Sequence, residues 1–144
     1  MIEELLQQHR ELLDLASELE HLTNDNEPAV PLIAQLRWQL SSLVGKHLAA
    51  QDEAMRLLAR HGLKSNEQAI IDAYFADLVD LRLSFADHNA RWTLTAVRGD
   101  WLTYGLAARE QTASLGKRIV WEEQFLFPLL RRLAAIQSER DKAA

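Results

Sequence analysis

Three side chains that can donate a lone pair to a metal ion lie far apart in the sequence, at His9, His47 and Glu122. Each falls in an otherwise apolar stripe with spacings of three and four residues, which is typical of the buried face of a helix. A buried histidine or carboxylate is unfavourable unless it meets a partner. Gln51, His88 and Arg118 lie on or beside the same kind of stripe. These polar groups are therefore predicted to meet one another or a metal ion inside the protein.

A permanent cation lies one helical turn before the glutamate, in "RIVWEEQFLFPLLRRL" at 118–133. Arg118 and Glu122 are four residues apart, so they share one helix face. Arginine has no lone pair and stays protonated, so Arg118 cannot bind a metal ion. It can neutralise a buried carboxylate and donate several hydrogen bonds. We expect Arg118 to pair with Glu122, and Asp52 or Asp80 to share the guanidinium.

Other polar residues lie beside the same stripes. Gln51 follows His47 by four residues and offers a neutral carbonyl oxygen without a charge. Asp52, Glu53 and Glu123 flank the apolar faces and are expected to be solvated. For His9 an alternative to metal ligation stays open, in which the ring is a core histidine hydrogen-bonded to a glutamate of the last helix.

The elements that would position these residues are helices. Strong break signals occur in "TNDNEPAVP", "RHGLKSNE" and "VRGDW". Gly62 suits a helix C-terminus, Ser65 or the competing Asn66 suits the next N-terminal cap, and Asp100 suits the last one. Short connections make successive helices antiparallel neighbours. The pattern predicts an all-α, up-down-up-down antiparallel four-helix bundle over 1–137 and a solvated tail at 138–144. The expected helices are 2–22, 30–61, 66–97 and 100–137.

"HRELL" at the start, "HLAAQDEAMRLL" in the second helix and "RIVWEEQFLFPLLRRL" in the last resemble a hemerythrin-like (HHE cation-binding) domain. The resemblance covers nearly the whole chain. It implies a four-helix bundle with a metal centre that takes a histidine from helix 1, His-x-x-x-Glu from helix 2, histidine from helix 3 and His-x-x-x-Glu from helix 4.

Matched position by position, the resemblance gives an incomplete ligand set. His9 and His47 match histidine ligands, and Glu122 matches the carboxylate of the last helix. Gln51 stands where the carboxylate of the second helix would be, and Arg118 where the histidine of the last helix would be. The sequence therefore predicts a degenerate metal centre.

His88 does not supply the missing ligand of the third helix. At 1.5 Å per residue it is displaced by roughly 10 Å from the level of His47. The residues of the third helix at that level are near Asp77, Asp80 and Leu81. His88 is instead expected to pack against Trp92.

Composition excludes several classes of protein. A net charge of −5 and a pI near 5.5 disfavour nucleic-acid binding, which needs a basic face. With no cysteine, the chain has no disulfide, thiolate metal site or thiol catalysis. The start "MIEELLQQHRELL" is amphipathic and acidic, unlike a signal peptide, and no apolar run approaches the ~18 residues of a membrane span. We expect a soluble cytoplasmic protein.

Two functions follow from these residues. The first is a metal-free or weakly metal-binding module that acts through a small ligand or a protein partner, without enzymatic activity and without a cofactor. The second is an iron protein that binds oxygen, nitric oxide or iron through His9, His47 and Glu122, since two histidines and one carboxylate suffice for a mononuclear site. A hydrolase or transferase is disfavoured because no nucleophile has an evident base and no phosphate-binding loop occurs. The sequence carries no signal for an oligomeric state.

Overall fold

The computed structural model describes residues 1–144 except for the side chain of His61, and the described chain is helical apart from short connections. No strand occurs among these residues, and no helix in the described part is long and apolar enough to cross a membrane. The elements are α1 (Ile2–Thr23), α2 (Val30–Leu58), a 3-10 turn η1 (Ala59–His61), α3 (Ser65–Arg91), α4 (Leu94–Gly99), α5 (Trp101–Trp121), a π-helical turn η2 (Glu122–Leu126) and α6 (Phe127–Ala143).

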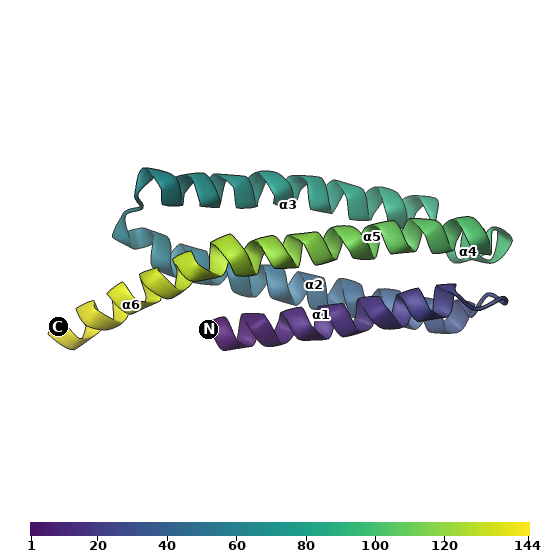
Figure 1. Ribbon diagram of the computed structural model, residues 1–144, viewed down its shortest axis with the longest axis horizontal. Helices are drawn as coiled ribbons and strands as arrows, with labels where there is room; N and C mark the ends of the chain where they lie inside the picture. The colour runs from purple at the N-terminus through teal and green to yellow at the C-terminus, as the bar shows by residue number, and fades with distance from the viewer.

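The long helices α1, α2, α3 and α5 lie side by side along the long axis of the molecule (Figure 1). α1 and α2 are joined at the end where the short α4 lies, and α2 and α3 are joined at the opposite end (Figure 1). α6 bends away from the line of α5 and carries the C-terminus beyond the other helices. The all-helical fold predicted from the sequence is confirmed.

Apolar side chains fill the bundle interior in three groups along its axis. The group near the α2–α3 connection includes Leu5, Met55, Tyr74, Leu126 and Phe127, the middle group consists of Leu12, Leu40, Leu115 and Ile119, and the group near α4 includes Leu19, Ile33, Trp92 and Tyr104. On α1, His9 lies between Leu5 of the first group and Leu12 of the second. The predicted polar cluster is thus enclosed by apolar layers on both sides.

The connection between α2 and α3 uses one predicted cap and one that was not predicted. Gly62 has φ of +73°, a backbone conformation that favours glycine, as expected for a residue after a helix end. The prediction of Ser65 as the N-cap is wrong. The cap is Lys64, whose backbone N–H donates to Glu67 Oε1 at 2.9 Å, because the glutamate reaches back over the first turn.

The third helix is shorter than predicted, because the chain breaks at Trp92 and Thr93 instead of continuing to residue 97. The Thr93 hydroxyl accepts a hydrogen bond from the backbone N–H of Ala96 at 3.2 Å and so starts α4. Arg37 Nη1 donates to the Trp92 carbonyl at 2.7 Å, which satisfies a backbone group freed by the break. The predicted cap at Asp100 is confirmed, since its carboxylate accepts from the backbone N–H of Thr103.

The last helix begins at Trp101, close to prediction, but is not one uniform α-helix. It passes through the π-helical turn η2, in which the Phe127 N–H bonds to the Glu122 carbonyl. Pro128 follows directly, and a proline inside a helix has no N–H and crowds the carbonyl four residues earlier, so a local change of helical pitch relieves both. Residues 138–144 are exposed, as predicted for a solvated tail, but they continue α6 as far as Ala143.

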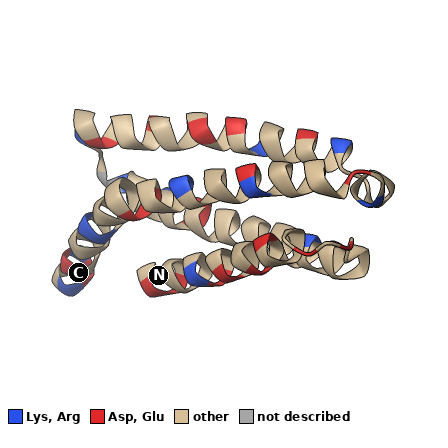
Figure 2. Cartoon of the chain, turned by 45° about the vertical axis from the view of Figure 1, so that its right-hand side comes forward, with Lys and Arg blue, Asp and Glu red and all other residues tan. Residues whose placement is uncertain are grey.

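Acidic and basic side chains are interspersed along the helices (Figure 2). Figure 2 also shows basic residues on α6 next to acidic ones.

Candidate metal centre

The structure brings His9 of α1, His47 of α2 and Glu122 of η2 together in the bundle interior. All three are buried, with exposures of 1%, 4% and 2%. His9 Nε2 lies 3.1 Å from His47 Nε2 and 2.9 Å from Glu122 Oε1, and His47 Nε2 lies 3.3 Å from the same oxygen. The predicted meeting of these residues at one depth is therefore confirmed.

The outer nitrogen of each imidazole is held by a second polar group. His47 Nδ1 lies 2.7 Å from Gln8 Oε1, and His9 Nδ1 lies 3.0 Å from Glu123 Oε2. Because amide and carboxylate oxygens only accept hydrogen bonds, each Nδ1 must carry the proton. Both rings are thereby fixed in orientation and in tautomer, as is usual for histidines that ligate metals.

This tautomer has a direct consequence at the centre of the cluster. With the proton on Nδ1, a neutral His9 and a neutral His47 each present a lone pair at Nε2, and Glu122 Oε1 presents another. Three acceptors at these separations repel one another unless a positive charge lies between them. That charge is either a proton, which makes one ring an imidazolium that donates to Glu122, or a metal cation.

The spacing of the three donor atoms suits one transition-metal ion. A tetrahedral ion with bonds of about 2.0–2.1 Å separates its ligand atoms by roughly 3.3 Å. The observed separations of 2.9, 3.1 and 3.3 Å are close to that value. Two imidazoles and one carboxylate are also ligands that zinc and non-haem iron accept. The residues present therefore fit a single cation.

Gln51 lies in the cluster but does not point a carbonyl oxygen at the centre. Its Nε2 donates to Glu122 Oε1 at 2.6 Å, and its Oε1 accepts from the Tyr74 hydroxyl at 3.1 Å. Gln51 thus belongs to the buried polar network, as predicted, but its carbonyl oxygen is taken by Tyr74 and is not directed at a metal ion. Gln51 instead fixes the position of the Glu122 carboxylate.

Arg118 lies inside the bundle, as predicted, with its side chain 9% exposed. Its Nε is 3.0 Å from Glu122 Oε2, and its guanidinium carbon lies 5.0 Å from the ring centroid of Tyr74. The N–H groups are not aligned with any acceptor in the described structure, so the contact with Glu122 is an ion pair without a well-directed hydrogen bond. The ring face of Tyr74 adds a favourable cation–π contact.

The two carboxylates predicted to share Arg118 lie elsewhere. Asp52 is paired with Arg56, one turn further along α2, and its side chain is 39% exposed. Asp80 and Asp77 border a surface groove of about 350 Å³ that Arg118 also lines, but the guanidinium forms its ion pair with Glu122. The carboxylate partner of Arg118 is Glu122 on its own helix.

The electrostatics of the cluster favour a charged Glu122. Burial raises the pKa of Glu122, but the hydrogen bonds with His47 and His9, the Arg118 charge and the Gln51 amide together lower it to about 2, from an ordinary value of 4.5. Burial, aided by the Glu122 charge, raises the pKa of Tyr74 to about 12 against the opposing effect of Arg118. Glu122 is therefore an anion and the Tyr74 hydroxyl a donor throughout the physiological range.

A second cation does not fit this donor set. The free oxygen of Glu122, Oε2, faces the guanidinium of Arg118, so the carboxylate cannot bridge two metal ions. Gln51 turns its amide nitrogen inward where a second carboxylate would be needed. A metal ion beside Arg118 would also meet a fixed positive charge in a region of low dielectric constant.

Four contributors to the cluster were not predicted from the sequence as such. Glu123, expected to be solvated, is 42% exposed yet reaches His9, because the π-helical turn begins with both glutamates. Phe127 stacks on the His9 ring with centroids 4.9 Å apart. Gln8 contacts His47, and Tyr74 contacts Gln51. The signal for Gln8 was its place beside His9 in an apolar stripe.

His88 lies outside this cluster, as the depth argument predicted. Its ring is 6.1 Å from Tyr104, and Trp92 is 5.5 Å from the same tyrosine. The ring contact predicted between His88 and Trp92 is thus replaced by contacts of both with Tyr104, because the backbone turns at Trp92.

Comparison of the chain with models of protein families, with curated proteins and with solved structures gave no match in any of the three.

Proposed function

We propose that this chain is a hemerythrin-like, up-down-up-down antiparallel four-helix bundle that binds one divalent transition-metal cation, iron or zinc, without enzymatic activity. His9, His47 and Glu122 hold the cation, and Arg118 occupies the place of a ligand to a second one. The observation that carries this proposal is the convergence of the two Nε2 atoms and Glu122 Oε1. Their separations are close to the roughly 3.3 Å expected between two ligand atoms of one tetrahedral ion.

The charges around the cluster support a single cation. Glu122 and Glu123 together carry two negative charges, and Arg118 supplies only one positive charge. The cluster therefore has a net charge of −1 without a metal, +1 with one divalent ion and +3 with two, so one ion is tolerated far better than two. The lone pairs of His9 and His47 are oriented toward the position of that ion. A bound divalent ion would supply a Lewis-acidic position, while Gln8, Gln51 and Glu123 hold the ligands in place.

A second candidate keeps the same fold without a metal. In it, a proton on one imidazole links His9, His47 and Glu122 into a closed polar network, and the protein acts as a binding or regulatory module through a partner. The short contact from Gln51 Nε2 to Glu122 Oε1, at 2.6 Å, favours this candidate because that oxygen is already engaged. Metal binding separates the two candidates.

The test is thermal unfolding of metal-stripped protein with and without zinc(II) or anaerobic iron(II). A cation that binds only the folded state raises the unfolding temperature. We expect this rise in the parent and in His21→Ala, which removes an exposed histidine at the end of α1, and its loss in His47→Ala. Equal rises in the parent and in His47→Ala would contradict the proposed ligand set.

A gain-of-function variant tests the role of Arg118. Gln51→Glu combined with Arg118→His restores the residue types that the resemblance implies at these positions. The pair adds a carboxylate and an imidazole and removes the fixed positive charge, so metal affinity should rise well above that of the parent. Unchanged affinity in a folded double variant would show that Arg118 does not limit metal binding.

A further inference from the structure

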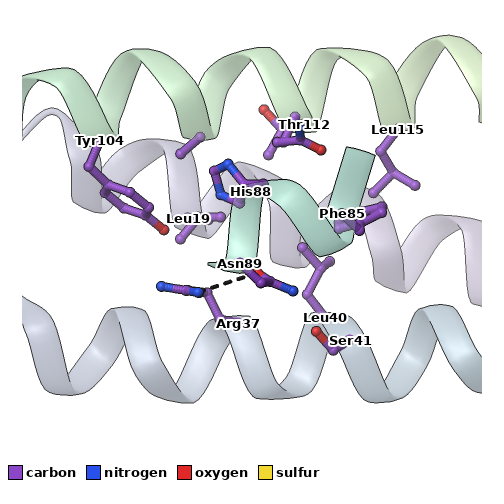
Figure 3. A pocket seen from close by; sticks show the side chains of 12 residues that line it. Leu19, Arg37, Leu40, Ser41, Phe85, His88, Asn89, Tyr104, Thr112 and Leu115 are labelled. Atoms are coloured by element: carbon purple, nitrogen blue, oxygen red, sulfur yellow. Dashed lines mark hydrogen bonds between the residues drawn. The ribbon is translucent and has the colours of Figure 1, made fainter. Parts of the chain in front are cut away.

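A second polar site lies inside the bundle (Figure 3), beside Tyr104 of the apolar group near α4. Tyr104 on α5 is fully buried, with an exposure of 0%, and its hydroxyl has no hydrogen-bond partner in the part of the protein that the structure describes. Buried hydroxyls without a partner are unfavourable and rare in native proteins. An acceptor from outside the polypeptide would complete the site.

The tyrosine borders a cavity of about 30 Å³ between α1, α2, α3 and α5. Its walls are mainly apolar, formed by Leu19, Leu40, Phe85, Ala108 and Leu115. The volume exceeds the roughly 10–15 Å³ that one water needs and is far below the roughly 150 Å³ of a cavity that binds benzene. A molecule of a few non-hydrogen atoms fits, and an aromatic ring does not.

Arg37 provides the positive charge of this cavity. Its Nη1 donates to the Trp92 carbonyl at 2.7 Å and its Nη2 to Asn89 Oδ1 at 3.3 Å, so the guanidinium is held at the cavity wall (Figure 3). No aspartate or glutamate is among the described residues that line the cavity. Glu20 accepts a hydrogen bond from the hydroxyl of Thr112, a residue that lines the cavity.

The other polar groups that line the cavity carry no fixed charge, and two of them, His88 and Tyr104, can titrate. Burial lowers the pKa of His88, and the Arg37 charge lowers it further. Burial also raises the pKa of Tyr104, with Arg37 acting in the opposite direction. Near neutral pH the cavity therefore presents a cation, an uncharged imidazole and an O–H donor, which together favour an acceptor with a negative charge.

We propose that this cavity binds a small carboxylate, of the size of formate or acetate, with the Tyr104 hydroxyl donating to one oxygen and Arg37 balancing the charge. The site is independent of the proposed metal centre. Leu19 lies ten residues beyond His9 on α1, which corresponds to roughly 15 Å along the helix. Loss of metal binding at His9 would leave it unchanged.

Two tyrosines in the chain make a direct measurement possible. In protein labelled with ¹³C at tyrosine Cζ, Tyr104 and Tyr74 give two resonances, which Tyr104→Phe assigns. Titration with sodium formate should shift the Tyr104 resonance to saturation and leave that of Tyr74 in place. Sodium chloride at equal concentration should move neither, and benzoate should fail to bind because its ring is too large.

Arginine variants test the charge. Arg37→Gln should weaken formate binding by roughly tenfold or more, because a charge-assisted interaction is lost. Arg37→Lys keeps the charge and should retain most of the affinity. Arg98→Gln removes an exposed arginine and should bind like the parent.

If Arg37→Gln does not fold, titration of the parent still decides whether formate binds beside Tyr104. A Tyr104 resonance that stays fixed, moves equally in chloride, or responds equally to benzoate would overturn the proposal, because a structural water would then suffice.

Discussion

The two polar regions inside this bundle differ in how completely the chain satisfies them. Around His9 and His47, both nitrogens of each ring have a polar neighbour, and Glu122 meets four side chains. Around Tyr104, the buried hydroxyl has no partner from the described protein, and a cavity lies beside it. The first region is built by the polypeptide except for one positive charge, whereas the second leaves a place for a molecule.

The difference arises largely from α3. Its buried residues are Glu67, Ile71, Tyr74 and Leu78, all in its first half. Tyr74 therefore reaches the cluster around Glu122, where its hydroxyl donates to Gln51 and its ring lies against the guanidinium of Arg118. After Leu78, residues such as Phe85 and His88 are only half-buried, so this helix leaves a cavity over Tyr104.

The largest expected effect is the loss of Arg118. Arg118→Ala leaves Glu122 as a buried carboxylate without its fixed counter-charge, which should destabilise the protein by about 3–5 kcal/mol. Arg56→Ala is the matched control, since that arginine pairs with Asp52 at the same i, i+4 spacing but is 77% exposed. The control should change stability by less than about 1 kcal/mol. Chemical denaturation of both metal-stripped variants measures the difference. Equal midpoints would show that Arg118 is not needed to stabilise the buried Glu122 carboxylate.

The acid sensitivity of the metal-stripped protein should depend on Glu122. Its pKa is lowered from 4.5 to about 2 in the folded protein, so the unfolded state binds the proton more tightly. The resulting stabilisation is fully present above pH 4.5 and is lost as the pH falls toward 2. Integrated over that interval it amounts to about 3 kcal/mol.

Denaturation midpoints measured between pH about 6 and about 3 check this dependence. Glu122→Gln should flatten the profile in this window, because the group that titrates has been removed. Glu139→Gln, which removes a carboxylate that is 80% exposed, should leave the parent profile unchanged. A profile that keeps its full slope in Glu122→Gln would place the acid-sensitive group elsewhere.

The same substitution in the two regions should have different effects. Tyr74→Phe removes the O–H that donates to Gln51, leaves a buried amide oxygen unpaired, and should destabilise by about 1–2 kcal/mol. Guanidinium denaturation provides the measurement. No loss of stability in this variant would mean that the chain from Tyr74 through Gln51 to Glu122 does not contribute.

Tyr104→Phe should have the smallest effect. In formate-free solution the hydroxyl has no protein partner to lose, so the free energy of unfolding should stay within about 0.5 kcal/mol of the parent or increase. A loss as large as that of Tyr74→Phe would remove the contrast between the regions. It would indicate that the Tyr104 hydroxyl is satisfied from within the protein or by a tightly held water.

The sequence was sufficient for the helices and for the meeting of polar groups on their buried faces, because both follow from spacing. The choice of His9, His47 and Glu122 among those groups came from the resemblance to hemerythrin-like domains. Apolar positions three and four apart define the buried faces, and His9, His47 and Glu122 fall on those faces. The pairing of Arg118 with Glu122 also follows from a four-residue separation on one helix.

Features that depend on local backbone changes or on neighbouring helices could not be predicted in this way. The break at Thr93 competes with a continuous helical pattern, and only the contact of Arg37 with Trp92 shows why it is favoured. The π-helical turn brings Glu123 to His9, although uniform α-helical spacing directs it to solvent. The orientation of Gln51 is decided by Tyr74, a residue on another helix.

The central claim is that the interior cluster takes one metal cation and that Arg118 excludes a second. The most direct test is to titrate metal-stripped protein with zinc(II) or anaerobic iron(II), remove excess metal by gel filtration, and measure metal per chain by elemental analysis. The account predicts one ion per chain in the parent and none in His47→Ala. Two ions per chain would contradict the role assigned to Arg118, and none in the parent would contradict the metal site itself.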